Sequence, residues 1–135
     1  MVSGIYNRFK ANLMSGAVDL DEAGDTIKVA LYDNNHSFTA TDNTYSSTNE
    51  LATGNGYTQD DKTLTGQSVT EGATTKFDAD DVSWSEATFT AYHAVLYSAT
   101  ASNNLICSFD FGGAQTVTGG TFTIQWNEDG IITLA

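Results

Sequence analysis

The residues that could carry covalent or acid–base chemistry are few, and they are scattered along the chain. His36 follows a polar Asn-Asn pair, which predicts an exposed loop position, and His93 falls in a strand-like apolar pattern, which predicts a buried one. Cys107 lies in the apolar run 105–111, which is typical of a buried small hydrophobe. The sequence has no Gly-x-Ser-x-Gly elbow, no Gly-Lys-Ser/Thr phosphate loop and no metal-like histidine or cysteine spacing. We therefore expect a protein that is not an enzyme, with no catalytic residues, no cofactor and no zinc site.

Carboxylates gather in two clusters that could attract calcium, an ion that prefers oxygen ligands. One cluster contains Asp19, Asp21, Glu22 and Asp25, and the other contains Asp78, Asp80 and Asp81. Neither follows the spacing of an EF-hand loop. Solvated acidic turns are the commoner explanation of such runs, and we expect no bound metal.

The aromatic residues leave open a binding role. The ones that could line a sugar-binding face are Tyr32, Tyr57, Tyr92, Tyr97 and Trp84. Aromatic side chains in a β-rich protein more often fill the core, because each buries a large apolar area. A carbohydrate-binding module is therefore kept as an alternative.

Length and charge restrict the class of protein further. The chain has 135 residues, which suits one domain, and a formal net charge of −12 with five basic residues. Such a surface repels nucleic-acid phosphates and anionic lipid, so neither nucleic acid nor membrane is expected as a partner. No apolar run approaches the ~20 residues of a membrane helix, and residues 1–8 lack the apolar region of a secretory signal. We therefore expect synthesis in the cytoplasm.

The N-terminal residues predict one short helix. Ile5, Phe9 and Leu13 recur every fourth position, as on one face of an amphipathic helix. Ser3 is placed to cap its beginning, and Gly16 is placed to end it. The domain organisation that follows is a helix or arm over residues 1–16 and a single β domain over residues 17–135.

This helix also holds two of the few basic residues, Arg8 and Lys10. One interpretation is that the helix packs on its own sheet, and the other is that it grips a neighbouring subunit. The residues hypothesised to form that interface are Ile5, Arg8, Phe9, Lys10 and Leu13.

The rest of the chain predicts short strands. Alternating or apolar runs occur at 26–32, 62–70, 74–77, 82–84, 88–98, 105–111, 121–126 and 131–134. A polar stretch from 36 to 61 predicts a long surface loop, and glycine pairs at 112–113 and 119–120 predict breaks. The fold class is thus all-β, an antiparallel β-sandwich or barrel-like arrangement with one short N-terminal α-helix. The predicted core consists of Phe89, Val95, Leu105, Phe109, Phe122, Ile124 and Trp126.

Three segments are similar to a known family. They are residues 2–14 (VSGIYNRFKANLM), residues 25–32 (DTIKVALY) and the C-terminal residues 120–126 and 130–134 (GTFTIQW and GIITL). Together these resemble small virion structural proteins of tailed bacteriophages, and the resemblance extends over nearly the whole chain. It implies a component of the phage particle, in the head or in the tail.

The strongly acidic surface suits the outside of a particle better than its DNA-facing interior. We therefore expect a capsid decoration (cement) protein on the outer surface of the virion head, synthesised in the host cytoplasm. Its expected partners are the major capsid protein and copies of itself, with a homotrimer implied by the resemblance. It would stabilise the assembled shell because it binds that state and not the dissociated one. The alternatives are a tail or neck component and a carbohydrate-binding host-attachment module.

Overall fold

The computed structural model describes residues 3–135. Over this range the elements are β1 (Gly4–Ile5), α1 (Asn7–Ser15), β2 (Ile27–Tyr32), β3 (Ser68–Thr70), β4 (Thr75–Asp78), β5 (Val82–Ser98), β6 (Asn104–Ile124) and β7 (Ile132–Leu134). The predicted fold class, all-β with one short N-terminal helix, is confirmed. No helix within this range is both long and apolar enough to cross a membrane.

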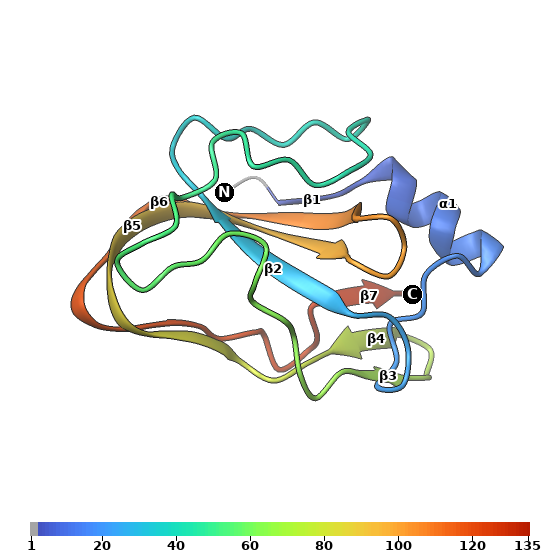
Figure 1. Ribbon diagram of the computed structural model, residues 1–135. Coiled ribbons are helices and arrows are strands. Elements are labelled where there is room, and N and C mark those ends of the chain that lie inside the picture. Colours follow the sequence, from blue (N-terminus) through green and yellow to red (C-terminus); the bar gives the residue numbers. More distant parts are fainter. Residues whose placement is uncertain (1–2) are drawn as a thin grey trace.

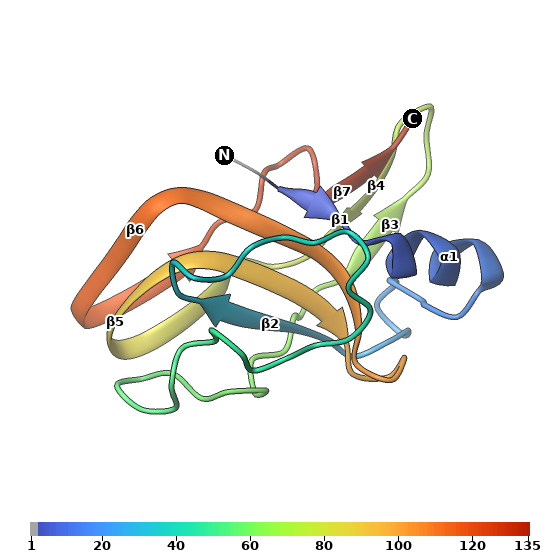
Figure 2. The same cartoon turned by 90° about the horizontal axis from the view of Figure 1, so that it is seen from above.

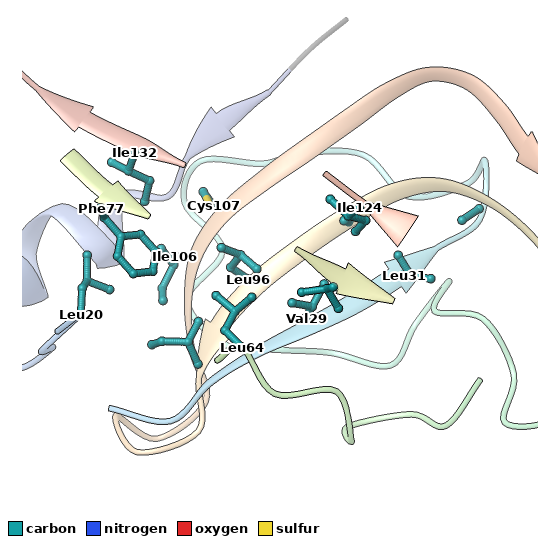
Figure 3. Close-up of a cluster of buried hydrophobic side chains, with 14 of the residues drawn as sticks. Leu20, Val29, Leu31, Leu64, Phe77, Leu96, Ile106, Cys107, Ile124 and Ile132 are labelled. Carbon is teal, nitrogen blue, oxygen red and sulfur yellow. The ribbon is translucent and has the colours of Figure 1, made fainter. Parts of the chain in front are cut away.

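The strands form two antiparallel sheets. The large sheet has the order β1-β6-β5-β2, and the small sheet has the order β3-β4-β7. Strands β5 and β6 make one long, curved hairpin that dominates the large sheet, while the small sheet lies beside α1 (Figures 1 and 2). Ile27 from the large sheet and Phe77 and Ile132 from the small sheet belong to the same buried cluster, so the two sheets share one core. This core is drawn in Figure 3.

Strand β5 is buried on both faces over its second half, as its two-sided apolar pattern predicts. Ala94 and Leu96 pack into the core between the sheets, whereas Val95 and Tyr97 pack on the opposite face. Ala91 also packs into the core between the sheets, because the pairing register shifts between Ala91 and His93. Such a bulge adds one residue to the strand and exchanges the two faces beyond it. Strict alternation along the predicted strand 88–98 would place positions 89, 91, 93, 95 and 97 on one face, and the bulge makes that expectation wrong.

The glycine pairs of β6 bend the strand and do not break it. β6 runs without interruption from Asn104 to Ile124. Gly112 and Gly119 have φ angles of 80° and 58°, a region that favours glycine, and open space surrounds the position of a Cβ at each. The requirement for glycine at these two positions is therefore conformational.

The predicted core is correct in part. Val95, Leu105 and Ile124 are buried. The four aromatic members, Phe89, Phe109, Phe122 and Trp126, pack against the core but keep part of their surface exposed. Apart from Tyr6 and Tyr57, the largest fully buried side chains instead come from β2, from the second half of β5 and from the start of β6.

The helix begins later than predicted. It starts at Asn7 with Tyr6 at the N-cap and no side-chain cap, while the hydroxyl of Ser3 accepts a 3.3 Å hydrogen bond from the Asp110 N–H. The reason is that β1 pairs with β6, which holds residues 4 and 5 in an extended conformation. Gly16 ends the helix in the left-handed conformation, as predicted, with a φ of 76°.

The chain between β2 and β3 is largely irregular, as the polar stretch 36–61 predicts. The predicted strand over 62–70 is regular only at Ser68–Thr70. Before it, the backbone of residues 62–64 runs along the edge of β2, where Val29 N–H donates to Lys62 O and Leu64 N–H donates to Ile27 O. This segment therefore covers an edge of the large sheet, which would otherwise present unpaired backbone groups.

Candidate functional site

An apolar groove separates α1 from the small sheet. It encloses about 230 Å³. Its apolar lining comes from α1 (Phe9, Leu13), the connection after it (Val18, Leu20), β3 (Val69), β4 (Phe77) and β7 (Ile132, Leu134). We call this groove, with the outward surface of α1 and the edges of β3 and β7, the helix–sheet face.

The exposed hydrophobic side chains gather on the helix–sheet face. Within residues 3–135 the large hydrophobic side chains with high exposure are Met14 at 91%, Val69 at 45% and Leu134 at 56%. Val69 and Leu134 line the groove itself, and Met14 follows Leu13, which also lines it. Exposed apolar side chains scattered singly are normal, but a group around one groove is typical of an interaction surface.

The interface residues hypothesised from the sequence divide into two groups. Phe9 is 3% exposed and belongs to the core of its own chain, and Ile5 and Leu13 are packed against that core. Arg8 and Lys10 are exposed on α1. The helix therefore packs on its own fold. Of the hypothesised residues on it, Arg8, Lys10 and part of Leu13 are open to a partner.

Most of the basic residues lie either on α1 or on the wall of the groove. Arg8, Lys10 and Lys76 are three of the five basic residues, and Lys76 lines the groove. None of the three forms an ion pair within the part of the chain that the structure describes, whereas Lys28 pairs with Asp60 at 3.4 Å. The helix–sheet face thus combines apolar surface with unpaired positive charge on a strongly acidic protein.

Sequence reasoning missed Val69 and Leu134. Val69 is the middle residue of β3 (Ser68–Thr70) and Leu134 is the last residue of β7 (Ile132–Leu134), and these three-residue strands form the two edges of the small sheet. In the sequence they look like ordinary core-facing strand residues. No signal in the sequence marks them, because the shortness of these strands, which leaves apolar side chains uncovered, appears only in the structure: the strand predicted over 62–70 is regular only at Ser68–Thr70.

A second site lies on the other side of the large sheet, where His36 and His93 meet. Their ring centroids are 5.0 Å apart, and His36 Nε2 is 3.3 Å from the hydroxyl of Ser108. The expectation that His36 is simply exposed is therefore wrong, since the segment after β2 folds back over the sheet. Burial, and the positive charge that His93 can carry, lower the pKa of His36, and the nearby carboxylates Asp42, Asp33 and Asp110 oppose that shift.

This arrangement does not make a catalytic serine. Ser108 is 1% exposed, so no substrate can reach its hydroxyl. Within residues 3–135 the His36 ring has no side-chain hydrogen bond other than the one with Ser108, and no carboxylate orients it. Cys107 is 3% exposed, and burial raises the pKa of its thiol, which makes it a poor nucleophile at neutral pH.

A buried carboxylate holds the segment after β2 in place. The Glu50 side chain accepts hydrogen bonds from the hydroxyls of Tyr45 and Tyr57, the second at 2.5 Å. The Tyr57 hydroxyl in turn accepts a 2.9 Å hydrogen bond from the Leu31 N–H of β2. Burial raises the pKa of Glu50, although these hydrogen bonds oppose the shift. Because its partners are all supplied from within the chain, Glu50 has a structural role.

The other candidate chemistries receive no support from the geometry. In the described range no group of three or more His, Cys, Asp or Glu side chains is placed to hold a metal ion. Asp19 instead accepts a 3.0 Å hydrogen bond from the Asp21 N–H, as in a polar turn. Tyr57, Tyr97 and Trp84 are at most 3% exposed, so they do not form a sugar-binding surface.

Comparisons of the chain with protein-family models, with curated proteins and with solved structures found no match. Its function must therefore be inferred from its own sequence and geometry.

Proposed function

We propose that this chain is a non-enzymatic structural protein of a tailed-phage virion, and more specifically a decoration (cement) protein on the outside of the capsid. The observation that carries the proposal is the helix–sheet face, where the exposed side chains of Val69 and Leu134 line one apolar groove and Met14 is exposed on α1. The assignment to a phage particle comes from the sequence resemblance of the N-terminal helix, of β2 and of the C-terminal strands. The major capsid protein and further copies of this chain, in a homotrimer, are the proposed partners.

The chemistry of the helix–sheet face suits attachment to a protein surface. Burial of the exposed apolar side chains supplies affinity, at about 25 cal/mol for each Å² removed from water before the costs of association. Arg8, Lys10 and Lys76 orient the partner and speed encounter more than they add to affinity. A partner surface with apolar side chains and carboxylates would complement this face.

The remaining surface suits exposure on the outside of a particle. The chain has a net charge of −12. Only two of its five basic residues, Lys28 and Lys62, lie away from the helix–sheet face. Lys28 is paired with Asp60, and Lys62 lies 5.2 Å from the ring of Trp84. An acidic outer surface repels DNA and keeps neighbouring particles apart. Binding of many copies to an assembled shell stabilises that shell by mass action.

Electron cryomicroscopy of purified virions tests the proposal. The decoration function predicts density for this fold repeated over the whole outer surface of the head, with the helix–sheet face toward the major capsid protein. Density confined to the neck or tail would contradict the decoration function but would still be consistent with a structural role in the virion. Absence of the chain from purified virions, by mass spectrometry, would contradict both.

A further inference from the structure

The segment after β2 encloses a polar cavity of about 250 Å³ on the large sheet, on the face opposite to the small sheet. Its floor consists of buried side chains. Three come from strands of the large sheet and one from the residue between β1 and α1: Tyr32, Val95, Leu105 and Tyr6. Its walls come from residues 35–49. Figures 1 and 2 show this segment, in cyan to green, on one side of the large sheet and the small sheet on the other.

Nearly all of the wall side chains are neutral hydrogen-bonding groups. They are Asn35, Ser37, Thr39, Thr44, Ser46 and Thr48. Only His36 and Asp42 among the lining residues can carry a charge in the neutral pH range. Within the described residues the side chains of Ser37, Thr39 and Thr44 make no hydrogen bond to the protein, so their hydroxyls are available to a ligand.

The walls are fixed before any ligand arrives. The Tyr32 hydroxyl donates a 2.6 Å hydrogen bond to Ser46 O, and the Asn49 amide donates a 3.3 Å hydrogen bond to Asn35 O. On the other side, Leu105 N–H donates to Asn43 O at 2.9 Å. A pre-formed wall lowers the entropic cost of binding, which is the usual condition of a small-molecule site.

The charges around the cavity decide which ligands it accepts. No lysine or arginine lines it, and Asp33, Asp42 and Asp110 all act on His36 at its edge. Phosphate and carboxylate ligands are therefore repelled. A divalent cation lacks the carboxylates it would need. An apolar ligand would leave the wall hydroxyls without hydrogen-bond partners, which is costly.

We propose that this cavity binds a single unit of a neutral saccharide. A sugar without charged groups presents several hydroxyls, each a donor and an acceptor, and these match the serine, threonine and asparagine side chains of the walls. The cavity is smaller than the roughly 300–1,000 Å³ of drug-sized sites, so it accommodates one ring and not an extended chain. A chain attached through the helix–sheet face would leave this cavity open, but the inference does not depend on that attachment.

Titration by nuclear magnetic resonance tests the site. The probes are D-glucose, D-galactose, D-mannose and N-acetyl-D-glucosamine, with D-glucuronic acid and glucose 6-phosphate as anionic counterparts. We expect at least one neutral sugar to shift the backbone amide signals of residues 35–49, and both anionic sugars to bind at least about tenfold more weakly. If no neutral sugar shifts these signals, or if an anionic sugar binds as tightly as the neutral ones, the inference is overturned.

Variants separate the cavity from nonspecific binding. The double substitution Ser37→Ala and Thr44→Val removes two wall hydroxyls at exposed positions, where the fold tolerates the change. It should weaken binding of the shifted sugar about fivefold or more, the scale expected for lost hydrogen bonds. The matched control is Thr121→Val, an exposed threonine of β6 outside the cavity, which should bind as the parent does. Unchanged affinity in the double variant would place the sugar elsewhere and overturn the proposed site.

Discussion

The imidazole ring of His36 lies edge-on to that of His93, with 5.0 Å between the ring centroids, although the two residues belong to separate elements. His93 stands on β5, and His36 lies in the segment that follows β2. Both rings cannot carry a positive charge at this distance without mutual repulsion. The contact therefore links the protonation of His36 to the position of the segment that forms the polar cavity.

This contact predicts a dependence of stability on pH. The pKa of His36 is lowered in the folded protein, mainly by burial, from an ordinary value of 6.5. The unfolded chain therefore binds a proton at a higher pH than the folded chain does. The resulting stabilisation is complete above pH 6.5 and is lost as the pH falls through the lowered pKa of the folded state.

Denaturant unfolding between pH 4 and pH 8 measures this effect. We expect the difference in unfolding free energy between the parent and a His36→Gln variant to decrease as the pH falls below about 6.5. His93→Gln serves as a second variant, because it removes the repulsion and should raise the pKa of His36. A difference between parent and His36→Gln that is constant over the whole range would contradict this account.

The bond between Tyr57 and Glu50 gives a second prediction. Tyr57→Phe removes the donor to a buried carboxylate and the acceptor for Leu31 N–H, while it keeps the ring in place. The loss should cost about 1–3 kcal/mol of unfolding free energy, because it leaves buried polar groups without a partner. Tyr92→Phe is the control, since Tyr92 is only half-buried. Urea denaturation that shows equal effects for the two variants would be inconsistent with a role for Glu50 in fixing this segment.

The two neighbouring glycines of β6 give a matched pair for a third prediction. Gly119 has a φ of 58°, whereas the φ of Gly120 is not in the positive region. Gly119→Ala should destabilise the protein by about 1–2 kcal/mol, the cost of placing a Cβ in the left-handed conformation. Gly120→Ala should be close to neutral or stabilising. The two melting temperatures decide the matter, and the idea fails if Gly120→Ala is the more damaging change.

A fourth prediction concerns the core. Leu96 is fully buried between the sheets, while Phe122 on β6 is only partly buried. Leu96→Ala should cost about 2–5 kcal/mol, as deletions in packed cores do. Phe122→Ala should cost less than the full burial of an aromatic ring would imply. Larger destabilisation from Phe122→Ala, measured by urea unfolding, would show that the inner face of the sandwich is assigned wrongly.

The sequence is most informative where local pattern and tertiary structure agree. β2 follows from the alternation of Ile27, Val29 and Leu31, and the end of the helix follows from Gly16, because each depends on neighbouring residues alone. The faces predicted for β5 by simple alternation are wrong beyond Ala91, because a bulge depends on pairing with the partner strand and produces no pattern in the local sequence. The local sequence predicts that Ser3 caps the helix, but the pairing of β1 with β6 holds the next residues in an extended conformation, so the helix begins beyond the reach of Ser3.

The candidate sites are harder to predict than the fold. Arg8 and Lys10 are found as exposed charges on the helix, but Phe9 from the same pattern is part of the core. Whether the side chain of Leu134 is covered depends on how far the strands of the small sheet extend. The sequence does not reveal that length. The polar cavity depends on how residues 33–49 fold back over β5, through contacts between residues distant in sequence.

Binding to capsid shells is the most direct test of the account. Purified shells that lack the chain are mixed with the parent or with the double variant Val69→Asp and Leu134→Asp, and bound protein is measured by co-sedimentation. Both positions are exposed, so the variant should fold, and its thermal unfolding transition verifies this. Thr121→Asp serves as the control, because it introduces the same charge at an exposed position away from the helix–sheet face. We predict that the parent and Thr121→Asp saturate the shells, while the double variant binds at least about tenfold more weakly because its charges oppose apolar burial. Equal binding of a folded double variant would contradict attachment through the helix–sheet face.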